Sequence, residues 1–158
     1  MGNAEDTSSA RPPAGPKYEF CSPGWLAAYH GAMAACVAIA AVDTPDLSFS
    51  ICELASDPPV HLSPDGQPCG FHCFVRDGVL ERFGAGDAAG VERKIVIDYA
   101  VMIDICRFEI GRSRERAVAY REMTKAAYEA GQLHFEGEQP RLPAPFHRLH
   151  DTIARITA

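Results

Sequence analysis

The fold is decided by residues 92–137, which read ERKIVIDYAVMIDICRFEIGRSRERAVAYREMTKAAYEAGQLHFEG. Their first part, 94–99, is rich in β-branched and apolar residues, which favours a strand. From 100 to 110 the apolar residues recur at helical spacing, which predicts a helix that Gly111 ends. The predicted apolar face of this helix consists of Val101, Ile105 and Phe108.

The second part of the stretch predicts a longer helix and another strand. Ser113 can cap the helix, because a serine hydroxyl accepts a hydrogen bond from a free N–H group of the first turn. Up to Gly131, small and apolar residues follow at steps of three and four: Ala117, Tyr120, Met123, Ala127 and Ala130. Residues 132–136 then alternate between polar and apolar, as in a strand with one buried face. Neither helix carries a nucleophile beside a base, and both have an apolar face wide enough to cover something large.

This order of elements resembles the sterol carrier protein 2 (SCP2) family. The matching features are an acidic residue before the short helix (Asp98), a glycine after it (Gly111), a small residue and glycine closing the long helix (130–133) and a second glycine after the strand (136–138). A helix predicted over 146–156 stands where the family has its C-terminal helix, and the resemblance covers roughly residues 45–157.

The resemblance implies an α+β fold with a mostly antiparallel five-stranded sheet. Helices would cover one face of that sheet, and the C-terminal helix would lie over a lipid-sized apolar cavity. Residues 1–16, rich in Ala, Pro, Gly and Ser, are expected to be a flexible tail, and residues 17–158 a single domain.

Local signals outside this stretch complete the predicted sheet. Ser22-Pro23 is a strong helix start, and Trp25 begins an apolar helix face. Residues 47–54 alternate like a half-buried strand. The runs 70–76 and 79–83 flank Asp77-Gly78, the sequence typical of a two-residue type I′ hairpin turn.

Composition limits the possible functions. The chain has 158 residues and a net charge of −6, which argues against nucleic acid as a partner and allows at most transient membrane contact. No apolar run reaches the length of a transmembrane helix, and the N-terminus lacks an apolar signal core, so we expect a cytoplasmic protein that could form a homodimer. The six cysteines are expected to be reduced and structural.

The leading hypothesis is a module that binds a hydrophobic ligand, such as a fatty acyl chain, an acyl-CoA or a sterol. Pockets for such ligands are mainly apolar with a few polar groups. The residues expected to line the cavity are Phe49, Ile51, Phe71, Val101, Ile105, Phe108, Tyr120, Met123, Phe146, Leu149 and Ile153. No cofactor is expected. No metal is expected either, because Cys69-x-x-His72-Cys73 is not followed by a second pair of ligands.

Two alternatives stay open. A small isomerase, hydratase or lyase could use the same cavity, with Asp98 or Glu53 as a buried acid or base beside Tyr99 or His72. Against this, Asp98 is expected to cap the helix that follows it. The last helix could instead pack against a partner or a second subunit. Its histidines, at 147 and 150, are expected to be solvated.

Overall fold

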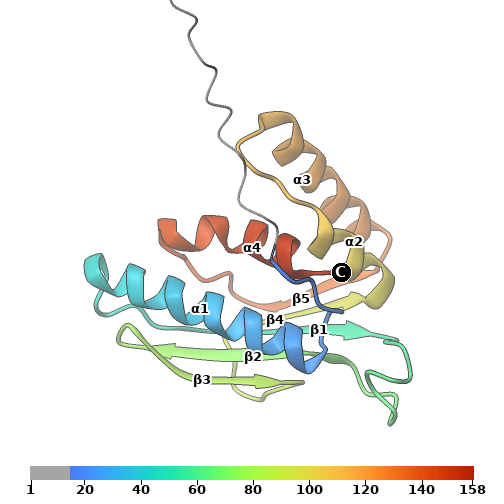
Figure 1. The fold of residues 1–158 in the computed structure, drawn as a ribbon, viewed down its shortest axis with the longest axis horizontal. Helices are drawn as coiled ribbons and strands as arrows, with labels where there is room; N and C mark the ends of the chain where they lie inside the picture. Colours follow the sequence, from blue (N-terminus) through green and yellow to red (C-terminus); the bar gives the residue numbers. More distant parts are fainter. Residues whose placement is uncertain (1–14) are drawn as a thin grey trace, which may run out of the picture.

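A computed structural model describes residues 15–158, which form a sheet with helices on one face (Figure 1). The strand order is β3-β2-β1-β4-β5, and only β1 and β4 run parallel. The fold is therefore α+β with a mostly antiparallel five-stranded sheet, as predicted. The strands are β1 (Phe49–Ser56), β2 (Cys69–Arg76), β3 (Val79–Ala85), β4 (Arg93–Asp98) and β5 (Leu133–Gly137).

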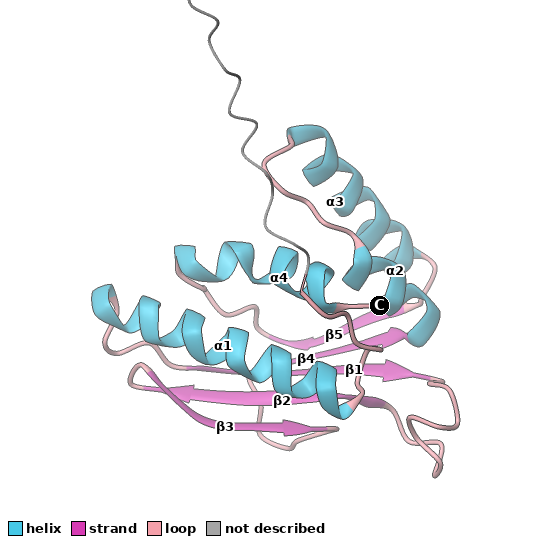
Figure 2. Ribbon diagram, viewed as in Figure 1, coloured by secondary structure: helices cyan, strands magenta, loops and turns pink. Residues whose placement is uncertain are grey.

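The helices lie together above one face of the sheet (Figure 2). Helix α1 lies toward the β3 side of the sheet with the C-terminal helix α4 beside it, whereas α2 and α3 lie beyond them toward β5 (Figure 1). The helices are α1 (Pro23–Asp43), α2 (Tyr99–Arg107), α3 (Arg114–Glu129), the 3₁₀ helix η1 (Ala144–Arg148) and α4 (Leu149–Ile156).

The hairpin between β2 and β3 forms where the turn residues predict it. Asp77 and Gly78 both have positive φ angles, 47° and 70°, which is the combination that a type I′ turn requires. Val79 pairs with Arg76 directly across the turn. This prediction is confirmed.

Helix α1 anchors the core. Ser22 caps it by accepting a hydrogen bond from the Trp25 N–H, and Trp25 is fully buried against Phe20.

In length and composition α1 could cross a membrane, so the prediction that no segment reaches that length is wrong. Here one side of α1 packs on the sheet through Trp25, Tyr29, Met33, Val37 and Ala40.

Helix α2 is shorter than predicted, ending at Arg107 instead of Ile110. The backbone N–H groups of Ile110 and Gly111 donate to the carboxylate of Asp151 on α4, at 2.7 and 3.1 Å. These bonds hold residues 108–111 against α4 and prevent another helical turn. Asp98 precedes α2 without capping it, because its carboxylate accepts from the Ser56 hydroxyl instead. The capping prediction is therefore wrong.

The last helix also begins later than predicted. Residues 144–148 form η1, with Pro143 directly before it and Pro145 in its first turn. The α-helix starts only at Leu149. By contrast, the Ser113 cap of α3 is confirmed, since its hydroxyl accepts from the Arg116 N–H.

The two ends of the described chain meet. Tyr18 forms a bridge with Thr157, whose hydroxyl accepts from the Trp25 indole N–H at 3.0 Å. This contact fastens the end of α4 to the start of α1. Of the predicted tail, residues 1–14 lie outside the described residues, and Gly15 and Pro16 belong to no helix or strand. All six cysteines are free thiols.

Candidate ligand cavity

A cavity of about 220 Å³, partly open to solvent, lies between the sheet and the helical layer. All the helices contribute to its wall, together with β1 and β2. The wall consists of Tyr29, Met33, Phe49, Ile51, Glu53, Phe71, Met102, Ile105, Cys106, Tyr120, Leu142, Phe146, Leu149, His150 and Ile153. The cavity is smaller than the lipid-sized one that the resemblance implies.

Strand β1 forms the floor of the cavity. Side chains of a strand alternate between its faces, so Phe49, Ile51 and Glu53 all point toward the helices. On β2, Phe71 pairs with Glu53 across the ladder and points to the same side. Above them, Phe146 of η1 contacts Phe49 edge to face, with ring centroids 5.4 Å apart. The wall of the cavity between these layers is therefore mostly apolar.

Glu53 is the only acidic residue in this wall. Burial raises the pKa of its carboxyl group from 4.5 to about 7, and no hydrogen bond or positive charge among the described residues offsets that effect. The β1 backbone at this point is fixed by Gly70, since a Cβ there would lie 1.9 Å from the Glu53 carbonyl oxygen. The Glu53 backbone is thus fixed in the sheet, and its carboxyl group faces the cavity.

Three other ionisable groups of the wall are kept neutral near pH 7. Burial raises the pKa of Tyr120 to about 12 and that of Tyr29 well above its usual value of 10, and Glu53 adds to both shifts. Burial likewise raises the pKa of the Cys106 thiol. The wall therefore offers hydroxyl and thiol groups that remain protonated.

His150 also belongs to the cavity wall, so the prediction that it is solvated is wrong. Its Nε2–H group donates a hydrogen bond to the Phe108 carbonyl oxygen, at 2.8 Å. Burial lowers its pKa, so the ring is neutral at pH 7. His150 was missed because its bond to Phe108 joins residues 42 positions apart, which the local sequence pattern does not indicate.

The cavity gathers eight of the eleven residues expected to line it. Phe49, Ile51, Phe71, Ile105, Tyr120, Phe146, Leu149 and Ile153 are in its wall. The other three lie elsewhere: Val101 and Met123 pack half-buried against the core, and Phe108 leaves α2 and contacts Arg116. Tyr29 and Met33 were not expected in the wall, although the buried face of their helix could have indicated them.

The four residues of the enzyme alternative are not brought together. Glu53 faces the cavity, whereas Asp98 bonds Ser56 at the end of the sheet. Tyr99 packs beside the Phe20 ring, and His72 points to the opposite face of the sheet, where its Nδ1 bonds the Gly86 carbonyl. Residues 15–158 contain no group of three metal-binding side chains.

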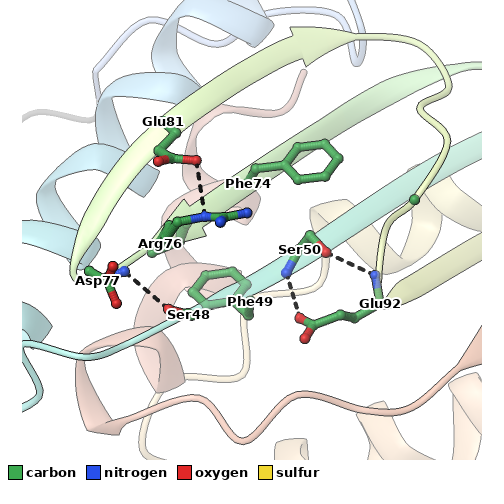
Figure 3. Close-up of a pocket in the computed structure, with 10 residues that line it drawn as sticks. Ser48, Phe49, Ser50, Phe74, Arg76, Asp77, Glu81 and Glu92 are labelled. Atoms are coloured by element: carbon green, nitrogen blue, oxygen red, sulfur yellow. Dashed lines mark hydrogen bonds and ion pairs between the residues drawn. The ribbon is translucent and has the colours of Figure 1, made fainter.

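A second hollow, of about 450 Å³, lies at the surface on the uncovered side of the sheet (Figure 3). Its polar groups largely pair with one another: Arg76 with Glu81, and Ser50 with Glu92 through two hydrogen bonds. The backbone N–H of Asp77 donates to Ser48. Because these groups are already satisfied, the internal cavity with its unpaired carboxyl group is the stronger candidate for a binding site.

This architecture is similar to solved structures of known proteins. A conserved hypothetical protein from Thermus thermophilus aligns with a TM-score of 0.53 at 14% identity, over 92% of this chain and 94% of that protein. Sterol carrier protein 2 aligns with a TM-score of 0.52 at 17% identity, over 89% of this chain and 100% of that protein. Family models and curated proteins give no match. The chain therefore has an SCP2-like fold, as the resemblance predicts, and at these identities the likeness concerns the fold.

Proposed function

We propose that the protein binds a hydrophobic ligand in the internal cavity. The main support is the volume of about 220 Å³ between largely apolar side chains of the sheet and the helices, because ligand pockets are concave and mainly apolar with a few polar groups. The SCP2-like fold adds support, and the ligand classes that the resemblance implies are a fatty acyl chain, an acyl-CoA or a sterol.

The size of the cavity restricts how such ligands would enter. Pockets for drug-sized ligands usually measure about 300–1,000 Å³. A whole sterol or long acyl chain would therefore require η1 and α4 to move outward, or only part of the ligand would enter. The Phe146–Phe49 contact is the one that such a movement would break.

Native mass spectrometry of protein purified from its own cells tests the proposal. We expect a mass increase that matches a hydrophobic small molecule, and saturable binding of a fluorescent fatty acid or sterol after that molecule is removed. A protein that carries no ligand and binds neither probe would contradict the proposal.

The second candidate function is an acid–base enzyme, favoured by the position of Glu53. A carboxyl group with a pKa of about 7 can accept and return a proton at neutral pH. It would act with Tyr29 or Tyr120, since Asp98, Tyr99 and His72 lie outside the cavity.

Deuterium exchange distinguishes the two functions. If Glu53 removes a carbon-bound proton, the ligand recovered after incubation in D₂O will carry deuterium on carbon, and the Glu53→Gln variant will abolish that label. A ligand recovered unlabelled from the unsubstituted protein would leave the carrier function alone.

A further inference from the structure

The Glu53 carboxyl group has no partner among residues 15–158, although it lies between the sheet and the helices. Protein surrounds the side chain, and the part of its surface that stays accessible faces the cavity. A desolvated charge without a partner is unfavourable, so proteins seldom retain one unless something else satisfies it. The cavity is the one direction from which a partner could come.

The described groups around Glu53 cannot neutralise its charge. The wall contains no Lys or Arg. Its single histidine, His150 on α4, has a lowered pKa, and its Nε2–H group donates a hydrogen bond to the Phe108 carbonyl oxygen. The other ionisable groups near Glu53 are the phenols of Tyr29 and Tyr120 and the thiols of Cys21, Cys73 and Cys106, from α1, α2, α3, β2 and the segment before α1. All of these are neutral when protonated and negative when ionised. Residues 15–158 therefore supply no cation here.

We propose that Glu53 is a specificity residue that binds the protonated amine of a small apolar ligand. This inference rests on the proposed function and names the polar group of that ligand. Glu53 would form a charge-assisted hydrogen bond with the ammonium group. The aromatic and aliphatic side chains of Phe49, Phe71 and Ile105 would surround the apolar part.

The same geometry disfavours an anionic group at this position. A carboxylate or phosphate that reached Glu53 would either repel it or require it to stay protonated. A fatty acid or acyl-CoA would therefore enter with its apolar end toward Glu53. An ammonium group is the polar group that would gain most from Glu53, because protein already surrounds most of this side chain before binding.

Three probes with one carbon skeleton test this inference: 2-phenylethylamine, 2-phenylethanol and phenylacetate. Binding to the full chain is measured by calorimetry at pH 7, for the unsubstituted protein, for Glu53→Gln and for the control Glu81→Gln. Glu81 is an exposed carboxylate on β3 that pairs with Arg76, outside the internal cavity. We expect the amine to bind at least tenfold more tightly than the alcohol, and phenylacetate to bind most weakly.

Glu53→Gln should remove the preference for the amine and leave the affinity for the alcohol within about twofold, whereas Glu81→Gln should change neither. A second readout needs no variant. Because binding an amine ionises Glu53, the unsubstituted protein should release about half a proton per amine at pH 7, and the binding enthalpy should differ between Tris and phosphate buffers.

Failure of this inference differs from failure of the proposed function. If the alcohol or the carboxylate binds as tightly as the amine, or if Glu53→Gln keeps the amine preference, the amine inference is wrong and the hydrophobic site stands. If none of the three probes binds saturably although the fluorescent fatty acid or sterol does, the amine inference is wrong and the hydrophobic site stands. If those larger probes also fail to bind, the site itself is wrong, and the inference falls with it.

Discussion

At the scale of single residues, Glu53 occupies an unfavourable position for a carboxyl group. Its carboxyl group replaces what would be an apolar side chain between Ile51 and Ala55 on the inner face of β1. Burial raises its pKa to about 7, which means that the folded protein resists ionising it. A residue that weakens the fold in this way is more readily explained by binding or catalysis than by packing.

The raised pKa of Glu53 predicts that stability falls as the pH rises. Between pH 4.5 and pH 7, the folded state holds a proton that the unfolded state has released, so each step upward in pH favours unfolding. This interval corresponds to roughly 3 kcal/mol. Urea unfolding from pH 4 to pH 8 should show that Glu53→Gln, which stays neutral, gains stability relative to the unsubstituted protein by about that amount.

His150 is present in both of these proteins, so its own titration cancels in the difference. The control is Glu81→Gln, a substitution of an exposed residue outside the cavity, which should change the unfolding free energy by less than about 0.5 kcal/mol. A constant difference between Glu53→Gln and the unsubstituted protein across this range would show that Glu53 reaches water.

At the scale of elements, α4 is fastened at its C-terminal end. Thr157 directly follows α4 and is fully buried, and its hydroxyl accepts from the Trp25 indole and donates to the Ile153 carbonyl. At the other end, η1 is held by the Phe146–Phe49 contact and by a weak bond from the Cys36 thiol to the Pro145 carbonyl. We infer that outward movement would begin at η1.

Thr157→Val tests the C-terminal attachment. Valine has nearly the same shape but leaves the Trp25 N–H without an acceptor, which should lower the unfolding free energy by about 1–3 kcal/mol. Trp25 is the only tryptophan, so its fluorescence reports this site directly. Thr152→Val, on the same helix with its hydroxyl on the exposed side, should cost less than about 0.5 kcal/mol and leave the emission unchanged. Equal costs for the two variants would contradict the attachment.

Phe146→Ala tests whether η1 lines an open site. Phe→Ala in a packed core usually costs about 3–5 kcal/mol, but Phe146 already borders a void, so we expect a cost below that range. Affinity for a fluorescent sterol or fatty acid should fall about tenfold. Phe20→Ala, in the packed core outside the cavity, should show the full cost. If both variants cost the same and binding is unaffected, Phe146 is ordinary core.

The elements that could be predicted from the sequence are those fixed by neighbouring residues. Asp77-Gly78 predicts the β2–β3 hairpin and Ser113 predicts the start of α3, because turns and caps form within a few residues. The end of α2 and the role of His150 could not be predicted. Both depend on bonds between α4 and residues 108–111, about 40 positions apart in sequence.

The lining residues show the same division. Phe49 and Ile51 follow from the alternation of a strand, and Glu53 continues that alternation, so its inward position could have been predicted from the same pattern. Phe108 was expected in the wall because α2 was predicted one turn too long. Val101 was expected there because a helical period identifies a buried face, but the period does not tell which part of that face borders a void.

At the scale of the whole molecule, the cavity results from how the layers meet. The central strands are covered by α1 on one side and by η1 and α4 on the other, with α2 and α3 beyond (Figure 1). Large side chains from all of these elements converge on the space above Ile51 and Glu53 without filling it. A fold that must retain such a space gives up the packing contacts that would close it.

Leu149→Phe tests whether this space is available inside the folded molecule. Enlarging a side chain in a well-packed core costs about 1–3 kcal/mol, because neighbours must move. Leu149 lies in the cavity wall, so the added ring atoms should enter empty space and cost less than about 1 kcal/mol, while reducing probe binding. The matched control is Val37→Phe on α1, since Val37 is buried at 2% exposure but does not line the cavity, and it should show the full cost. Urea unfolding and probe titration of both variants provide the comparison. If Leu149→Phe is as costly as Val37→Phe, the helices close over the cavity in solution, and a ligand would have to open it against the full packing energy of the core.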